Sequence, residues 1–201
     1  MEIRRPAQDD PLQRFLALLE RAKATPQVVE PTAMTLATVS AEGRPSARVV
    51  LLKDADEDGL VFYTNLDSRK GREALARPDV ALLFWWGPLE SQVRFEGRAE
   101  RVGDGEADAY FATRARGSQL GAWASAQSRP LASRAELEAK LAEVTEKFEG
   151  MPVPRPPHWS GLRVKPLSIE FWRNRPNRLH ERELYTREKP GAPWSVQLLN
   201  P

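Results

Sequence analysis

The first apolar stretch of the chain, DPLQRFLALLERAKAT at residues 10–25, has a helical period. Asp10 precedes it as a candidate N-cap, and Pro11 suits the first helical position. Spacings of three and four residues are typical of an amphipathic helix with one buried face. That face would consist of Leu12, Phe15, Leu16 and Leu19.

The pattern then changes to the alternating or continuously apolar runs of β-strands, at residues 33–40, 46–53, 60–64, 79–86, 91–102, 162–172 and 194–199. Polar links such as AEGRP and the acidic turn DADEDG join the first strands, as in a β-meander. Helices are predicted between groups of strands, not after every strand. This order favours an antiparallel, barrel-like α+β domain with flanking helices over a parallel βαβ fold.

Three further helices are predicted, at 68–76, 105–115 and 133–150. The last has the strongest signals, because Ser133 and Glu136 form a capping box and a glycine stands at its end. Its apolar stripe consists of Leu137, Leu141, Val144 and Phe148. No repeat or long linker divides the 201 residues, so one domain is expected over 1–201, with 1–9 as a flexible arm.

The composition is that of a soluble globular protein, with 41% hydrophobic and 29% charged residues. The chain has no cysteine, which excludes disulfides, thiolate metal ligands and cysteine nucleophiles. Two histidines are present, His158 and His180, and their separation rules out an HxxxH-type motif. No metal site is therefore expected.

The charge is nearly balanced, since 30 Lys and Arg against 28 Asp and Glu leave a net charge of +2. This balance argues against a general nucleic-acid-binding or membrane-binding surface. The N-terminal residues lack the apolar core of a signal peptide, and no apolar run approaches the roughly 20 residues of a membrane span. A cytoplasmic protein is expected.

Cations cluster at the start of the helix predicted for 68–76. Ser68 would cap this helix and place Arg69 and Lys70 in its first turn, where each opposes the helix dipole by about 0.3–1 kcal/mol. A bound phosphate would reverse that penalty, because helix-start amides and two cations form an anion site. A solvated basic turn explains the same residues almost equally well.

Two other groups have chemistry that suits an anion. Arg48 and Lys53 flank the apolar run VVLL, and their odd separation directs them to opposite faces of an ideal strand. Tyr110, Arg114 and Ser118 are spaced so that one helix would place all three on a single face, unless Gly117 ends that helix before Ser118. Taken alone, a solvated lysine and a chance arginine on a helix surface remain the simpler interpretations.

The stretch NRPNRLHERELY at 174–185 follows a predicted strand that ends in Trp172. If a strand resumes here, Arg178, His180 and Arg182 face the same side, because they lie two residues apart. An exposed basic strand end is the competing interpretation. Side chains that suit a polar heterocycle occur at Gln92, Gln127 and Ser128.

Together these groups indicate a phosphorylated cofactor beside a phosphorylated substrate. The runs RVVLLK, VFYTNLDSRK, SQLGAWASAQS and IEFW…NRLHER, in this order, closely resemble the pyridoxine (pyridoxamine) 5′-phosphate oxidase family. The resemblance covers essentially the whole chain from about Asp10. It implies an FMN-binding split β-barrel and a homodimer with flavin at the subunit interface. It also implies oxidation of pyridoxamine or pyridoxine 5′-phosphate to pyridoxal 5′-phosphate in vitamin B6 metabolism, with O₂ reduced to hydrogen peroxide.

The resemblance further assigns roles to single residues. Those expected to line the FMN are Arg48, Val49, Val50, Leu51, Leu52, Lys53, Tyr63, Thr64, Arg69, Lys70, Gln92, Gln127, Ser128, Trp172 and Arg182. Those expected to hold the substrate phosphate are Lys53, Tyr110, Arg114 and Ser118. Arg178 and His180 would contact the pyridine ring and act as the catalytic residues, closing over the substrate.

Two features depart from the family pattern. Only ten residues precede the first predicted helix, where family members often have a longer arm, and Leu198 stands where the family usually has arginine. Two other functions stay open. One is a flavin-binding split-barrel protein that reduces a different substrate with an external reductant, and the other is a non-catalytic carrier of pyridoxal phosphate.

Overall fold

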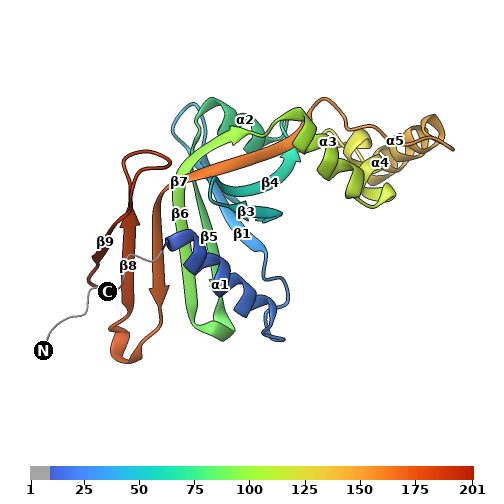
Figure 1. The fold of residues 1–201 in the computed structure, drawn as a ribbon. Helices are drawn as coiled ribbons and strands as arrows, with labels where there is room; N and C mark the ends of the chain where they lie inside the picture. Colours follow the sequence, from blue (N-terminus) through green and yellow to red (C-terminus); the bar gives the residue numbers. More distant parts are fainter. Residues whose placement is uncertain (1–9) are drawn as a thin grey trace, which may run out of the picture.

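The computed structural model describes residues 10–201, so the arm expected over 1–9 lies outside the described residues. The strands are β1 (Ala33–Val39), β2 (Pro45–Leu51), β3 (Asp54–Asp56), β4 (Gly59–Asn65), β5 (Asp79–Trp86), β6 (Ser91–Arg101), β7 (Trp159–Arg173), β8 (Glu181–Thr186) and β9 (Ser195–Leu198). The helices are α1 (Pro11–Lys23), α2 (Arg69–Ala76), α3 (Asp104–Thr113), α4 (Arg116–Ala124) and α5 (Arg134–Lys147), with short 3-10 turns η1 (Gly87–Leu89) and η2 (Pro176–Arg178). Figure 1 shows the strands curled into a half-barrel, with α3, α4 and α5 gathered at one end.

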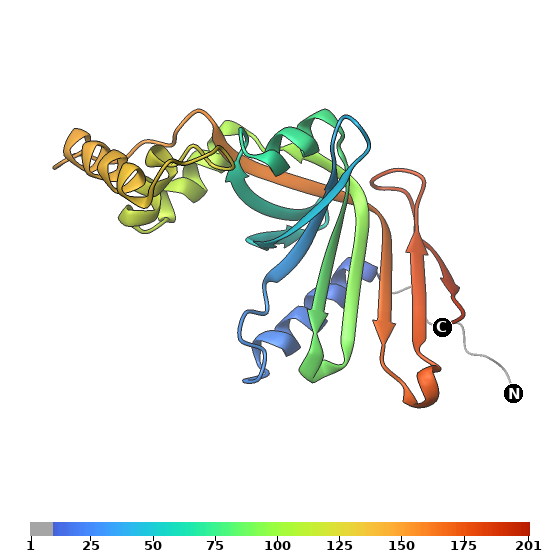
Figure 2. The same ribbon diagram turned by 180° about the vertical axis from the view of Figure 1, so that it is seen from behind.

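All strand pairs are antiparallel, and the main order is β2-β1-β5-β6-β7-β4-β3, with β8 and β9 added beside β7. The long strand β7 pairs with β4 near its start and with β8 near its end (Figure 2). A bulge at Glu96 and Gly97 interrupts its register with β6, which bends the sheet. A Cβ at position 97 would lie 2.2 Å from the carbonyl oxygen of Lys165, so this close approach requires glycine. The expected antiparallel α+β fold class is confirmed.

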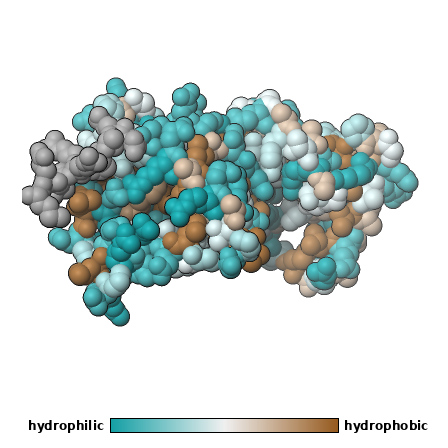
Figure 3. All heavy atoms as spheres, turned by 60° about the horizontal axis from the view of Figure 1, so that its bottom comes forward, coloured by the Kyte–Doolittle hydropathy of each residue, from teal (hydrophilic) through white to brown (hydrophobic). Residues whose placement is uncertain are grey.

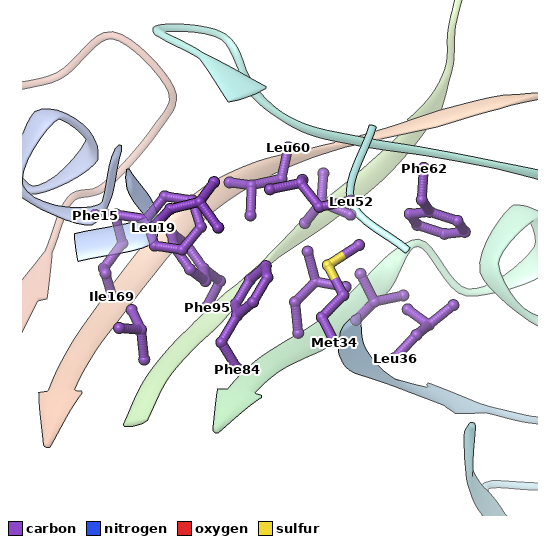
Figure 4. Close-up of a cluster of buried hydrophobic side chains, with 14 of the residues drawn as sticks. Phe15, Leu19, Met34, Leu36, Leu52, Leu60, Phe62, Phe84, Phe95 and Ile169 are labelled. Atoms are coloured by element: carbon purple, nitrogen blue, oxygen red, sulfur yellow. The ribbon is translucent and has the colours of Figure 1, made fainter. Parts of the chain in front are cut away.

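The core lies inside the curled sheet and is closed by α1. Asp10 caps this helix as predicted, since its carboxylate accepts a hydrogen bond from the Leu12 amide. Phe15 is fully buried, with ring centroids 5.0 Å from Phe84 and 4.8 Å from Phe95. Figure 4 shows these rings beside Leu60, Met34 and Leu36 from the neighbouring strands. Burial of each such side chain stabilises the fold by roughly 1.5–3 kcal/mol.

Helix α5 packs against α4 and buries less of its stripe than the sequence pattern predicts. Phe148 is buried, whereas Leu141 remains 39% exposed. Ser133 caps the helix as predicted, but the Glu136 carboxylate accepts from the Ala132 amide, one residue before the position of a capping box. Figure 3 shows apolar side chains at the surface of the end that carries these helices.

Two further details differ from or extend the sequence analysis. The acidic link predicted as a turn contains a short strand, β3, which pairs with β4. The predicted helix at 105–115 ends at Thr113, two residues early. Within residues 10–201, no helix combines the length and the apolar character that crossing a bilayer requires.

Candidate functional site

A cavity of about 510 Å³ lies among β2, β4, α2 and α4. Its size is in the range of small-molecule and cofactor sites. Ten of the residues expected at the cofactor or the substrate line it: Val49, Val50, Leu51, Lys53, Tyr63, Thr64, Lys70, Arg114, Ser118 and Gln127. The fold therefore brings together side chains that are separated by up to 78 positions in the chain. We call this the cationic cavity.

The charge of this cavity suits an anion. Lys53, Lys70 and Arg114 line it, and no Asp or Glu of residues 10–201 does. Burial lowers the pKa of Lys70, and the nearby Arg48 lowers it further. Burial also lowers the pKa of the Arg114 guanidinium. These shifts show positive charge with little compensation, which a bound anion would relieve.

Two polar atoms in the wall of the cavity are buried without a protein partner. Thr64 Oγ1 and Arg114 Nη1 have no hydrogen bond to any residue of the described chain. Buried polar groups are nearly always paired, and an unpaired one costs about 1–3 kcal/mol. Both atoms belong to residues that line the same cavity, so a ligand with several oxygen acceptors fits these residues.

The start of α2 forms one wall. Ser68 caps this helix as predicted, because its Oγ accepts a hydrogen bond from the Gly71 amide. Lys70 Nζ donates to Gln127 Oε1 at 2.7 Å and so ties α2 to the segment after α4. Arg69 Nε donates to Glu73 Oε1 at 2.8 Å. These hydrogen bonds hold both cations at the start of α2.

Five expected residues lie near the cavity without lining it: Arg48, Leu52, Arg69, Tyr110 and Ser128. The Arg48 guanidinium is occupied by hydrogen bonds to the Leu36 carbonyl, Thr38, Ser46 and Glu73. The Leu52 side chain is part of the hydrophobic core (Figure 4). Arg69 and Ser128 also fall outside the lining, although each is adjacent in sequence to a lining residue. Of the run from Arg48 to Lys53, the lining thus includes Val49, Val50, Leu51 and Lys53, and the assignment of the whole run to the cofactor stays a prediction.

The prediction that Tyr110, Arg114 and Ser118 share one helix face is wrong. Helix α3 ends at Thr113, Arg114 is extended with φ −72° and ψ 145°, and Ser118 belongs to the next helix, α4. The chain turns at Arg114, and this turn places Arg114 and Ser118 in the wall of one cavity. Their proximity comes from a helix–helix corner and not from helical periodicity.

An aromatic stack that the sequence analysis missed supports this wall. The rings of Tyr63 and Tyr110 are parallel within 9°, with centroids 3.9 Å apart, and Trp159 lies 5.3 Å from Tyr63. The Arg114 guanidinium lies 4.8 Å from the Trp159 ring, as in a cation–π contact. Burial, with smaller contributions led by Glu106 and Tyr110, raises the pKa of Tyr63 to about 12, so its hydroxyl stays protonated at neutral pH.

The remaining expected residues lie at the other end of β7. Gln92 and Trp172 are directly paired across β6 and β7, and both line a second cavity of about 320 Å³ beside α1. Arg182 faces Trp172 across β7 and β8, and its Nε donates to the buried Glu170 carboxylate. The His180 ring lies 4.6 Å from the Trp172 ring.

The prediction that Arg178, His180 and Arg182 form one row on a strand is wrong. The segment is the loop between β7 and β8, and strand structure resumes at Glu181. Asn177 and Arg178 adopt left-handed backbone with φ 59° and 61°. This conformation is rare outside glycine, costs of order 1 kcal/mol or more per residue and is concentrated at functional sites.

Strand β7 separates the two groups of residues. Trp159 at its start lines the cationic cavity, and Trp172 near its end lines the second cavity. At ~3.3 Å per residue these positions are separated by roughly 40 Å of strand. The residues expected at one site therefore lie beside two different cavities, at opposite ends of one strand.

Comparisons with known proteins agree with this architecture. The family model described as "Pyridoxamine 5′-phosphate oxidase" matches residues 20–148, and that described as "Pyridoxine 5′-phosphate oxidase C-terminal dimerisation region" matches residues 159–201. The crystal structure of PhzG from Burkholderia lata 383 in complex with tetrahydrophenazine-1-carboxylic acid is 34% identical, with a TM-score of 0.85 over 100% of this chain and 99% of that one. A pyridoxamine 5′-phosphate oxidase-related, FMN-binding protein from Nostoc punctiforme has a TM-score of 0.74 at 19% identity, over 96% and 98% of the two chains, and shows the same fold.

A curated relative from Myxococcus xanthus (strain DK1622), named pyridoxine/pyridoxamine 5′-phosphate oxidase, is 64% identical over 192 residues. The match covers 96% of this chain and 92% of the relative. Since the family models also cover most of the sequence, the chain belongs to the pyridoxine/pyridoxamine 5′-phosphate oxidase family and is an oxidoreductase.

Proposed function

We propose that this protein is an FMN-dependent oxidase that converts pyridoxamine or pyridoxine 5′-phosphate to pyridoxal 5′-phosphate, with O₂ reduced to hydrogen peroxide. The observation that carries the proposal is the cationic cavity. Three cations line it without an acidic residue of the described chain, and Thr64 and Arg114 each keep a buried polar atom unpaired. A site built in this way is suited to phosphorylated ligands.

The residues of α2 and its neighbours would hold the cofactor. Arg69 and Lys70 stand in the first helical turn, where backbone amides and side-chain cations together favour a phosphate. Thr64 and Gln127 would supply hydrogen bonds beside them. Bound FMN would supply the redox chemistry by accepting a hydride from the substrate and passing the electrons to O₂, while the protein binds and orients both molecules.

Another part of the lining would hold the substrate phosphate. Arg114 and Ser118 line it from the α3–α4 corner, and Lys53 lines it from beyond the end of β2. The stack of Tyr63, Tyr110 and Trp159 rigidifies this wall, since parallel rings leave little rotamer freedom. Fixed cations reduce the ordering cost of binding and place the reacting carbon reproducibly.

The second group of residues would reach the cationic cavity from a partner subunit in a homodimer. A partner subunit accounts for the position of Trp172, far along β7 from the cavity that it is expected to complete, and of Gln92 and Arg182, which pair with it from β6 and β8. The segment 159–201, which matches a dimerisation region, contains β7, β8 and the loop with Arg178 and His180. In a two-fold dimer each subunit would complete the site of the other.

The structural likeness to PhzG raises a second candidate, an FMN-dependent oxidase of a non-phosphorylated substrate. Purified protein with FMN should be incubated in air with pyridoxamine 5′-phosphate and, separately, with pyridoxamine. We expect pyridoxal 5′-phosphate and peroxide in equal amounts from the first and little product from the second. Equal turnover of both substrates would favour the second candidate, and binding of pyridoxal 5′-phosphate without any turnover would indicate a carrier.

A further inference from the structure

We propose that Glu73 is a positioning residue for the phosphate of FMN: it holds Arg69 through Nε and thereby presents the two terminal nitrogens of that guanidinium to the phosphate. The inference rests on the proposed function, because it takes the start of α2 as the phosphate site. Glu73 would not touch the ligand, and its effect would be transmitted through Arg69.

The carboxylate of Glu73 is fixed from several directions. It lies one helical turn after Arg69 on α2 and is 8% exposed. Oε1 accepts from Arg69 Nε at 2.8 Å, and Oε2 accepts from Thr38 Oγ1 at 2.5 Å. Oε2 also accepts from Ser46 Oγ at 3.1 Å and Arg48 Nη2 at 3.4 Å. Donors on β1 and β2 thus immobilise the acceptor to which Arg69 is bound.

The hydrogen bond to Glu73 leaves the terminal nitrogens of Arg69 available for a ligand. Nε is used by Glu73, whereas Nη1 and Nη2 donate to no residue among those described, and the side chain is 56% exposed. The terminal nitrogens of arginine form a fork that matches two phosphate oxygens. An arginine already anchored at Nε loses less conformational freedom when it binds, which strengthens binding.

Because Glu73 is charged, the proposal can be tested by the direction in which the affinity for FMN changes. Burial raises the pKa of Glu73, but hydrogen bonds from Thr38, Arg69 and Ser46 outweigh it and lower the pKa to about 2. The group is therefore an anion close to the proposed phosphate. Simple repulsion predicts that neutralising Glu73 tightens FMN binding, whereas positioning predicts that it weakens binding.

The experiment is a fluorescence titration of apo-protein with FMN and with riboflavin, which lacks the phosphate. The variants are Glu73→Gln and the matched control Glu138→Gln. Glu138 accepts from Arg134 Nε at 2.8 Å with the same four-residue spacing, but on the exposed helix α5. We expect Glu73→Gln to raise the Kd for FMN about tenfold and to leave the Kd for riboflavin unchanged. Glu138→Gln should change neither.

A second variant, Arg69→Lys, tests the same contact from the side of the arginine. Lysine at position 69 has a single amino group, so Arg69→Lys can contact the carboxylate or the phosphate well but not both. Arg69→Lys should weaken FMN binding and leave riboflavin binding unchanged. Adding Glu73→Gln to this variant should weaken FMN binding little further, since the effects of coupled residues are not additive.

Several outcomes would overturn the inference alone. These are unchanged or tighter FMN binding by Glu73→Gln, equal weakening of FMN and riboflavin, and full additivity of the two substitutions. Failure of the wild-type protein to bind FMN would instead overturn the proposed function, and the inference with it.

Discussion

Trp159 and Trp172 lie on the same strand, β7, and line two different cavities. Trp159 stands beside the cationic cavity, whereas Trp172 pairs with Gln92 and contacts the His180 ring. Because one strand separates them, residues expected at a single active site are divided between the two ends of the subunit. A homodimer in which each end completes the other's site accounts for this division.

The loop between β7 and β8 should act on the substrate and not on the flavin. Arg178→Ala should leave FMN content near normal and lower kcat/KM for pyridoxamine 5′-phosphate by about 10²-fold, because a misplaced reacting carbon slows the reaction by this order. His180→Ala should have a comparable effect if the imidazole also moves a proton, and a milder one if it only binds. Steady-state kinetics of FMN-saturated variants across pH 6–9 measures both effects.

Arg175→Ala is the matched control for this loop. It removes a guanidinium that is paired with Glu181 at the surface, and it keeps the backbone amide that donates to His180 Nδ1. An exposed ion pair of this kind contributes about 0–1 kcal/mol. Wild-type kinetics for Arg178→Ala, or equal losses in Arg175→Ala, would show that the loop is only a basic surface turn.

Arg114 should recognise the substrate phosphate. Arg114→Ala should raise KM for pyridoxamine 5′-phosphate by about 10- to 100-fold, since a hydrogen bond to a charged group contributes roughly 1.5–3 kcal/mol. The slow reaction of pyridoxamine, which has no phosphate, should be nearly unaffected and serves as an internal control. Equal losses with the two substrates would mean that Arg114 supports the fold of the α3–α4 corner instead.

Local signals in the sequence predicted most of the fold. The sequence predicts Asp10 and Ser68 correctly as N-caps, because a cap depends on residues within one turn. No Pro or Gly stands at the break between α3 and α4, because Gly117 lies inside α4. The helical spacing of Tyr110, Arg114 and Ser118 therefore continues across the break in the sequence. Pro176 and Asn177 do signal a turn, and that signal outweighs the strand pattern predicted for the loop.

Other site features depend on contacts that a local pattern cannot show. Trp159 reaches the cationic cavity because β7 pairs with β4, nearly 100 positions earlier in the chain. The local sequence around Glu73 is typical of a polar residue on a helix. Its burial depends on contacts with Thr38 and Ser46 from β1 and β2. The separation of the expected site residues within one subunit likewise follows from the length of β7 and from no single motif.

Gly161 should control the position of the Tyr63 ring. A Cβ at position 161 would lie 2.8 Å from Tyr63 Cε1 and 2.9 Å from Val102 Cγ2, so Gly161→Ala must displace the ring. We expect a loss of about 1–3 kcal/mol in the free energy of unfolding and a higher KM for the phosphorylated substrate. Gly105→Ala in α3 meets no atom within 4 Å and should stabilise the protein by about 0.5–1 kcal/mol. Denaturant unfolding of the two apo-variants measures both changes. A Gly161→Ala variant as stable as the wild type would contradict the close packing of Gly161 against Tyr63.

Glu73 should make stability sensitive to acid. Its pKa is about 2 in the fold against an ordinary value of 4.5, so its stabilisation is present above pH 4.5 and is lost as the pH falls toward 2. The difference in unfolding free energy between wild type and Glu73→Gln should therefore shrink by about 1–3 kcal/mol between pH 5 and pH 2. Urea unfolding at several pH values measures it. A difference that stays constant over this range would show that the carboxylate is not paired as described.

The most direct test of the shared active site uses mixed dimers. One subunit carries Arg114→Ala and Ser118→Ala, its partner carries Arg178→Ala and His180→Ala, and two affinity tags allow the mixed dimer to be purified. If each site combines the two groups from different subunits, the mixed dimer contains one site with all four changes and one intact site. It should then form pyridoxal 5′-phosphate at about half the wild-type rate, although both parent homodimers are nearly inactive. A mixed dimer as inactive as its parents would contradict the account, because it would place both groups of residues in a site within one chain.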